Sequence, residues 1–122
     1  MTKVLLAEAN EAVQFALALA LKKAGFNVSE AKNGNDVIDN DGLDDVDVVV
    51  TDILMPEKDG IALLMELRER APDLPVMAIS GGGRISSLNY LETASTMGAV
   101  AVFNKPFNEK LLTEKIESLV AA

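Results

Sequence analysis

The sequence contains no cysteine, no histidine and no tryptophan among its 122 residues, and aromatic side chains make up only 4% of it. Without cysteine it can form neither disulfide bonds nor thiolate metal sites, which is typical of proteins from a reducing compartment. Without histidine it has no imidazole for a catalytic triad or for a zinc site. Any chemistry must therefore rest on carboxylates, hydroxyls, amides and amines.

Positive charge is also scarce, since 11 basic residues stand against 19 acidic ones and the formal net charge is −8. Because the longest basic run is Lys22-Lys23, no cluster of positive charge is predicted to bind nucleic acid or an anionic membrane surface. No stretch of about 18 apolar residues is present to span a bilayer, and no signal peptide is recognisable after Met1. We therefore expect a cytoplasmic protein that binds neither nucleic acid nor membranes.

Short apolar runs alternate with longer amphipathic runs along the whole chain. The short runs predict strands at Lys3–Ala7, Phe26–Glu30, Asp47–Thr51, Val76–Ser80 and Ala99–Phe103. The longer runs predict helices near Glu11–Ala24, Asn35–Asn40, Ile61–Ala71, Ser87–Met97 and Asn108–Val120. This strict alternation predicts an α/β fold: a flavodoxin-like, doubly wound (βα)5 domain with five parallel strands in the order 2-1-3-4-5. Since no linker or repeat interrupts it, we expect residues 1–122 to form a single domain without an output domain.

Several residues mark where the predicted helices begin and end. Gly25 and Gly98 stand where a helix needs a left-handed residue just past its last turn. Asn10 precedes the first predicted helix, where its amide oxygen could serve either as the N-cap or as a metal ligand, and we favour the cap. Leu112 and Ile116 recur at helical spacing, which predicts that they belong to the core.

Polar residues follow the apolar runs at the edge where functional groups gather in parallel sheets, the carboxyl ends of the strands. The first strand leads into Glu8, the third into Asp52, the fourth ends in Ser80 and the fifth leads into Lys105. Taken singly, these residues have ordinary structural roles as turn, capping and surface residues. Taken together, they predict a small anion-handling site, with one carboxylate as the nucleophile and the hydroxyl and ammonium groups binding the transferred oxygens.

Three motifs within this pattern give the chain a family resemblance. They are TDILMP at 51–56 with the DG step at 59–60, the Ser80-Gly81 step after an apolar strand, and NKPF at 104–107. With these motifs, and over almost its whole length, the chain resembles a response-regulator receiver domain of two-component signalling. The resemblance implies that Asp52 accepts a phosphoryl group from a histidine kinase or phosphotransfer protein, and that the resulting aspartyl phosphate signals to a downstream protein partner. It also implies no enzyme in the ordinary sense, but a phosphoacceptor that assists its own phosphotransfer and dephosphorylation.

The same resemblance implies roles for the other residues of this edge. Ser80 would form a hydrogen bond with the phosphoryl group, and Lys105 would pair with its charge. Glu8, Asp52 and the main-chain carbonyl of Leu54 would hold Mg²⁺, a cation that prefers oxygen ligands and keeps several waters.

The chain departs from the family pattern at two positions. Where receivers usually carry a second acidic residue after the first strand, this chain has Ala9, which offers no oxygen to a metal. The alternative is therefore a pseudo-receiver that acts as an interaction module without phosphorylation. Where the family commonly has a Tyr or Phe, the chain has Val102, so we expect any conformational switch to involve the glycine run at 81–83 and the fourth helix.

Two other classes of protein share parts of this pattern. A phosphatase or dehalogenase with an aspartate nucleophile usually has a D-x-D arrangement, whereas Asp52 is followed by Ile53 and Leu54. A flavin carrier of the same architecture would have a first turn rich in glycine and hydroxyls, whereas the turn at residues 8–11 reads Glu-Ala-Asn-Glu. Both classes are disfavoured on these grounds.

Overall fold

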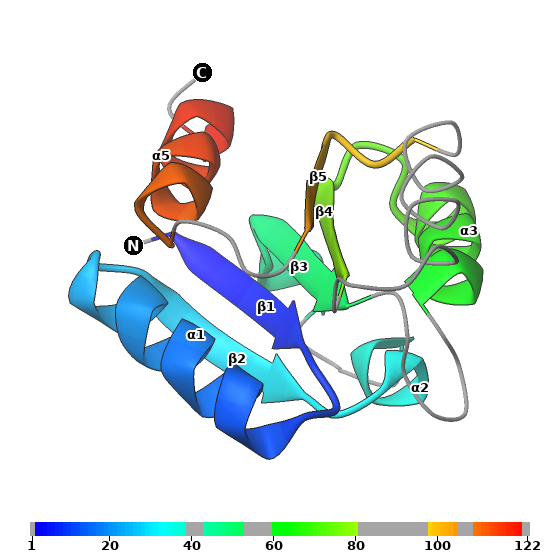
Figure 1. Ribbon diagram of the computed structural model, residues 1–122. Helices are drawn as coiled ribbons and strands as arrows, with labels where there is room; N and C mark the ends of the chain where they lie inside the picture. The colour runs from blue at the N-terminus through cyan, green and yellow to red at the C-terminus, as the bar shows by residue number, and fades with distance from the viewer. Residues whose placement is uncertain (1, 39–42, 53–59, 81–97, 105–108, 121–122) are drawn as a thin grey trace.

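The computed structural model describes residues 2–38, 43–52, 60–80, 98–104 and 109–120 (Figure 1). Its elements, in chain order, are β1 (Lys3–Ala7), α1 (Glu11–Lys23), β2 (Asn27–Ala31), α2 (Gly34–Ile38), the 3-10 turn η1 (Leu43–Asp45), β3 (Val48–Asp52), α3 (Gly60–Arg70), β4 (Val76–Ser80), β5 (Ala101–Asn104) and α5 (Glu109–Val120).

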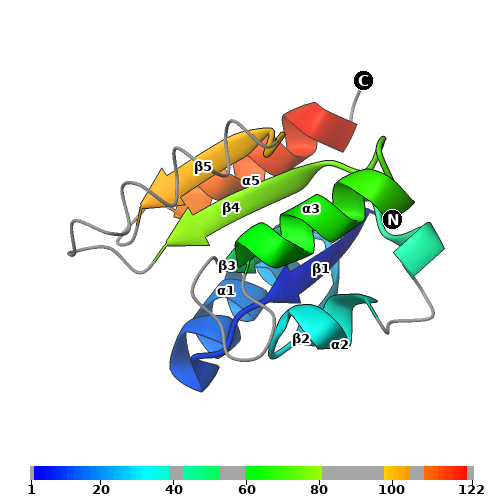
Figure 2. The same cartoon turned by 90° about the vertical axis from the view of Figure 1, so that its right-hand side faces the viewer.

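The strands form one parallel sheet in the order β2-β1-β3-β4-β5. Figure 2 shows the arrows of β1, β4 and β5 pointing to the same edge. The predicted flavodoxin-like parallel sheet is thus confirmed, with the predicted order for its first four strands. Beyond them, β5 pairs with β4 from Met77↔Ala101 to Ser80↔Asn104. The fourth helix, predicted at Ser87–Met97, lies outside the described residues.

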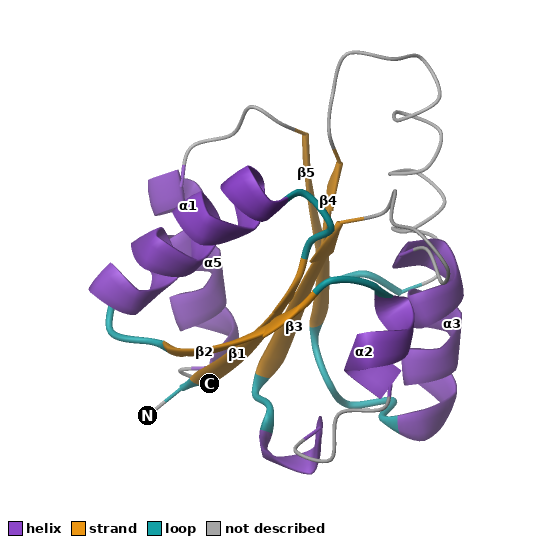
Figure 3. Ribbon diagram, turned by 90° about the horizontal axis from the view of Figure 1, so that it is seen from below, coloured by secondary structure: helices purple, strands orange, loops and turns teal. Residues whose placement is uncertain are grey.

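Helices cover both faces of the sheet, α1 and α5 on one face and α2 and α3 on the other (Figure 3). Successive strand residues point to opposite faces, so each strand contributes to two separate apolar cores. On the side of α1 and α5, Val48 and Val50 pack with Leu17 and Ile116. On the side of α2 and α3, Val49 packs with the leucines of α3. All five residues of β3 are buried, because β3 is a central strand covered on both faces.

Most element bounds agree with the sequence prediction to within one or two residues. The main difference at the first helix is that Phe26, predicted to start a strand, instead closes α1 through a hydrogen bond from its N–H to the carbonyl of Leu21, at 3.2 Å. Gly25, just past the end of α1, has φ +97°, the left-handed conformation that the sequence predicted there. Gly98 also has the predicted left-handed conformation, with φ +104°. The short turn η1 was not predicted.

The helix ends and the core stripe of the last helix also follow the prediction. The side chain of Asn10 accepts a hydrogen bond from the N–H of Val13 at 3.1 Å, so Asn10 is the N-cap of α1. In α5, Leu112 and Ile116 are buried against the sheet, as their spacing predicted. Asn108, the predicted N-cap of that helix, lies outside the described residues.

At the amino-terminal edge of the sheet, Lys3 and Asp47 fasten β1 to β3. The N–H of Lys3 donates to Oδ2 of Asp47 at 2.8 Å, and the N–H of Asp47 donates to the carbonyl of Lys3 at 2.9 Å. The carboxylate thus supplies one further acceptor where the ladder between the two strands begins. Because a slip by one residue would lose both bonds, this pair helps to fix the register of the two central strands.

Candidate functional site

Asp52 is the last residue of β3 and lies at the carboxyl edge of the sheet. The sequence prediction ended this strand at Thr51, with Asp52 leading out of it. In the structure Asp52 still pairs with β4, opposite Ile79, and only 6% of the residue is exposed. A strand end of this kind explains why a carboxylate follows a run of valines: the sheet interior holds its backbone while its side chain reaches the edge.

Glu8 directly follows β1, the strand that neighbours β3. The pairing of β1 with β3 ends at Ala7 and Thr51, and Glu8 and Asp52 are the residues that directly follow this last pair. Glu8 is only 1% exposed, and its Oε2 accepts a hydrogen bond from the N–H of Asn10 at 3.1 Å. Two carboxylates that the sequence predicted in one site therefore occupy adjoining positions, both largely withdrawn from water.

The neighbours of these carboxylates hold the backbone in place. The carbonyl of Ala31, at the end of β2, accepts hydrogen bonds from the N–H of Glu8 at 3.0 Å and from Nε2 of Gln14 at 2.9 Å. The hydroxyl of Thr51 donates to the carbonyl of Asp52 at 2.9 Å and is buried with it. Sequence reasoning missed both supporting residues. Gln14 carried a usable signal, because it occupies the same helix face as Leu17, Ala18 and Leu21, where a polar residue needs a buried partner.

The remaining site residues of the sequence prediction are only partly placed. Ser80 ends β4, opposite Asn104 at the end of β5, so its backbone lies at the same edge as Asp52. Its side chain lies outside what the structure describes. Leu54 and Lys105 are outside the described residues altogether.

The donor set at this edge suits a small, hard cation. Glu8 and Asp52 offer carboxylate oxygens, the ligand type that Mg²⁺ prefers. Ala9 adds no oxygen: its side chain packs against the apolar core on the side of α2 and α3. Asn10 is already committed as the helix cap. Within the described ranges, no group of three or more acidic residues is placed to hold a metal ion, so the described part of the site offers a cation two carboxylates.

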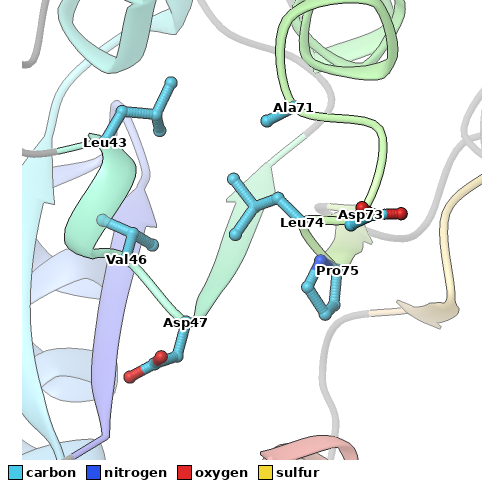
Figure 4. A pocket seen from close by; sticks show the side chains of 7 residues that line it. All are labelled: Leu43, Val46, Asp47, Ala71, Asp73, Leu74 and Pro75. Carbon is cyan, nitrogen blue, oxygen red and sulfur yellow. The ribbon is translucent and has the colours of Figure 1, made fainter.

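A shallow hollow lies at the opposite edge of the sheet (Figure 4). Its walls come from residues 43–47 on one side and 71–75 on the other, with Val46 and Leu74 buried between them and Asp47 and Asp73 exposed. Because it is formed where β3 and β4 begin, it contains none of the predicted site residues. None of the helices in the described segments is long and apolar enough to cross a membrane.

Comparisons with known proteins agree with this geometry. The model of the response regulator receiver domain family matches residues 4–117. The chain is 34% identical to the response regulator receiver protein CpdR of Brucella abortus, covering 100% of this chain and 99% of CpdR. It is 33% identical to the sensor kinase CckA of the same organism, of which it spans only 12%.

A solved structure supports the fold independently. The response regulator receiver domain protein of Clostridium thermocellum superimposes with a TM-score of 0.89 at 24% identity, over 99% of this chain and 95% of that one. The match to the family model covers nearly all of the sheet and helices described above, including both carboxylates at the carboxyl edge. The chain therefore belongs to the response regulator receiver domain family of two-component signalling.

Proposed function

We propose that this receiver domain accepts a phosphoryl group on Asp52 from a partner histidine kinase or phosphotransfer protein in a two-component phosphorelay. The observation that carries the proposal is the position of Asp52. It ends a buried central strand at the carboxyl edge of the sheet, and the buried Glu8 directly follows the neighbouring strand β1. Receiver domains are signalling domains rather than enzymes with a turned-over substrate.

In this reaction an oxygen of the Asp52 carboxylate attacks the phosphorus of a phosphohistidine on the partner. A P–O bond forms as the P–N bond breaks, and the electron pair of that bond stays on the histidine nitrogen. The neighbouring hydroxyl of Thr51 does not compete as a nucleophile, because it is buried and donates its hydrogen to the main chain. The chain's own contribution is to hold one carboxylate at the edge of a rigid sheet where the partner can reach it.

Receiver domains generally bind Mg²⁺, and the residues here fit that ion. We propose that Glu8, Asp52 and the main-chain carbonyl of Leu54 hold it, as the family resemblance implies. Held by these residues, Mg²⁺ would supply positive charge that offsets the repulsion between two carboxylates and an incoming phosphoryl group. Glu8 contributes its charge from a fixed position, since both its N–H and its carboxylate are hydrogen-bonded.

The remaining parts of the proposal concern residues that the structure describes in part or not at all. Ser80 is proposed to form a hydrogen bond with the transferred phosphoryl group and Lys105 to pair with its charge, which the strand pairing Asp52↔Ile79 and Ser80↔Asn104 supports. We propose that residues 87–97 complete a (βα)5 domain and that the chain acts as a single-domain cytoplasmic module. Its output is binding to a downstream protein rather than to nucleic acid or a membrane.

The test is phosphorylation from a small phosphodonor such as acetyl phosphate, followed by intact-mass measurement in the presence of Mg²⁺. We expect the wild type to gain one phosphoryl group, and Asp52→Asn to gain none. Asp73→Asn is the matched control, since it removes an exposed carboxylate at the opposite edge of the sheet and should still be phosphorylated. Equal phosphorylation of Asp52→Asn and wild type would exclude Asp52 as the acceptor.

The apolar, partly buried side chain of Ala9 favours a second candidate, a pseudo-receiver that interacts without phosphorylation. Its side chain lies against the apolar core where a third carboxylate would otherwise be available to a metal. The two candidates separate in an NMR titration with Mg²⁺ followed by beryllofluoride, a mimic of the phosphoryl group. Shifts around Glu8 and Asp52 support the phosphoacceptor, whereas no change at millimolar Mg²⁺ supports the pseudo-receiver.

A further inference from the structure

The hollow at the amino-terminal edge of the sheet has no part in the proposed phosphotransfer. It lies between residues 43–47, which lead into β3, and residues 71–75, which lead into β4, and it measures about 280 Å³. Pockets that enclose a small-molecule ligand usually measure about 300–1,000 Å³, so this one falls just below their range. Its size suits a side chain of a partner protein rather than a cofactor. We call it the edge hollow.

Hydrogen bonds hold the wall at residues 43–47 in place. The N–H of Val46 donates to the carbonyl of Leu43 at 3.1 Å, which closes the short turn η1. Asp47 is fixed to Lys3 by two bonds, one from its own N–H and one to its Oδ2. This wall is therefore held before anything binds, which lowers the entropic cost of binding.

The wall at residues 71–75 is held in the same way. The N–H of Leu74 donates to the carbonyl of Ala71 at 3.0 Å. The guanidinium of Arg68 donates to the carbonyls of Pro72 and Leu74, so this positive charge is engaged with the main chain. Because both walls are held by such bonds, the edge hollow is largely preformed, as binding sites usually are.

The floor of the edge hollow is apolar and its rim is acidic. Figure 4 shows the side chains of Val46 and Leu74 facing each other across it, and both belong to the core on the side of α2 and α3. Asp47 and Asp73 are exposed on opposite sides of the hollow (Figure 4). Among the described residues that line it, none is basic. An apolar group that enters would extend the core, and a cation on either side of that group would meet a carboxylate.

We propose that the edge hollow is a docking site for a basic peptide segment of a partner protein, in which one apolar side chain stands between two basic ones. The apolar side chain inserts between Val46 and Leu74, and the basic side chains pair with Asp47 and Asp73. In an extended peptide, side chains two positions apart point to the same side. A segment of the form Arg-x-Leu-x-Arg therefore presents all three groups to the hollow at once.

Charge complementarity selects this occupant. Asp45, on the same segment as Asp47, is a further exposed carboxylate beside the hollow. Arg70, the basic residue that directly precedes residues 71–75, forms an ion pair with Glu66 at 3.7 Å. The net charge of −8 attracts a basic partner over a longer range and repels acidic partners, a second copy of this chain among them.

The small size of the edge hollow sets the strength of binding. Ion pairs at an exposed rim are individually weak and are screened by salt. We therefore expect a short peptide to bind with a dissociation constant of about 1–10 mM, and a partner that adds contacts around the hollow to bind more tightly. Raising NaCl from about 0.05 M to about 0.5 M should weaken the peptide several-fold.

The first test is an NMR titration of the isotope-labelled protein with the peptide Ac-Arg-Gly-Leu-Gly-Arg-amide, up to about 20 mM. We expect saturable shifts at residues 43–47 and 71–75 and none at Glu8 or Asp52. One control peptide replaces both arginines by glutamate and another replaces leucine by glycine, and each should bind at least about tenfold more weakly. The proposal is overturned if the first peptide causes no shifts, or if either control peptide binds equally well.

The second test changes the hollow, with circular dichroism to verify the fold of each variant. Asp73→Asn keeps the shape of the side chain and should weaken the first peptide at least about threefold. Ala71→Leu fills the hollow and should abolish binding. Glu117→Gln makes the same change of charge at an exposed position of α5 and should bind like the wild type.

Each of these variants tests one part of the proposal. Unchanged affinity in Asp73→Asn excludes the charged contact, and unchanged affinity in Ala71→Leu excludes the insertion, so either result overturns the docking site. All samples are measured without phosphodonor, and Asp52→Asn should bind the peptide like the wild type. The result is therefore independent of whether Asp52 is a phosphoacceptor.

Discussion

Glu8 and Gln14 donate hydrogen bonds to the same acceptor, the carbonyl oxygen of Ala31. The first donor is the N–H of Glu8 at 3.0 Å and the second is Nε2 of Gln14 at 2.9 Å. One carbonyl at the end of β2 therefore connects the loop that carries a site carboxylate to the buried face of α1. Gln14, which has no part in the proposed phosphotransfer, therefore shares the acceptor that holds the backbone of Glu8.

From this relationship we predict that Gln14→Met lowers the free energy of unfolding by about 0.5–1.5 kcal/mol, since the substitution keeps the volume and removes the donor. Urea denaturation measures the change. Glu117→Met, at an exposed position of α5, is the control and should stay within about 0.5 kcal/mol of the wild type. Equal stability of Gln14→Met and the control would show that the shared acceptor contributes nothing.

The helix cap provides a second prediction. Asn10→Ala removes the acceptor for the N–H of Val13 and should reduce the free energy of unfolding by about 1 kcal/mol, whereas Asn10→Ser keeps an acceptor and should lose less. Because Asn10 is the cap and not a metal ligand, neither variant should change Mg²⁺ affinity by more than about twofold. A larger drop in affinity for both variants would mean that Asn10 binds the ion.

The two left-handed glycines should differ in their response to alanine. At Gly25 a Cβ would meet nothing within 4 Å, so Gly25→Ala should cost about 1–2 kcal/mol for the backbone conformation alone. At Gly98 the Cβ would lie 3.2 Å from Cδ of Arg68, whose guanidinium donates to the carbonyls of Pro72 and Leu74 and so cannot move freely.

We therefore expect Gly98→Ala to cost at least about 1 kcal/mol more than Gly25→Ala in thermal or urea unfolding. A double-mutant cycle separates the two causes. In an Arg68→Ala background the extra cost at residue 98 should disappear, while the backbone cost remains. An extra cost that persists without Arg68 would assign it to another neighbour.

An acidic residue at position 9, where receiver domains usually have one, should raise the affinity for Mg²⁺ and lower the stability of the metal-free protein. Ala9→Asp places a third carboxylate beside Glu8 and Asp52, so we expect Mg²⁺ affinity to rise by at least about tenfold. In the absence of Mg²⁺ the free energy of unfolding should fall by about 1 kcal/mol, because like charges repel and an apolar contact is lost.

Calorimetric titration and urea unfolding with and without Mg²⁺ measure both effects. Ser118→Asp adds the same charge at an exposed position of α5 and should change neither quantity appreciably. If Ala9→Asp leaves Mg²⁺ affinity unchanged, residue 9 does not face the cation site.

The sequence predicted the regular strands and the helix ends of the fold. The alternation of apolar runs predicted the first four strands to within one residue, because strands buried on both faces must be apolar throughout. The cap at Asn10 and the left-handed residue at Gly25 followed from local backbone requirements, which a single sequence shows directly. Features that depend on contacts between distant parts of the chain were harder to predict from the sequence. That Asp52 is still a strand residue depends on its pairing with β4, which no local pattern of β3 reveals.

The candidate site was predictable as a set of residues but not as a set of contacts. Parallel topology brings the carboxyl ends of neighbouring strands together, so the proximity of Glu8 and Asp52 along the edge could be inferred. The near-complete burial of Glu8 could not, because it depends on where α1 begins and on the bond from Asn10. The roles of Ser80 and Lys105 stay predictions.

The hydrogen bonds between Lys3 and Asp47 help to fix the register of β1 and β3 at the edge of the sheet opposite the candidate site. A designer could therefore rewrite the loops at the carboxyl edge, or graft another acidic pocket there, while the two central strands keep their alignment. The converse also holds. Asp47 is far from any reacting atom. Asp47→Ala nevertheless removes the acceptor for the N–H of Lys3, and so weakens the alignment of β1 with β3, the two strands that lead to Glu8 and Asp52.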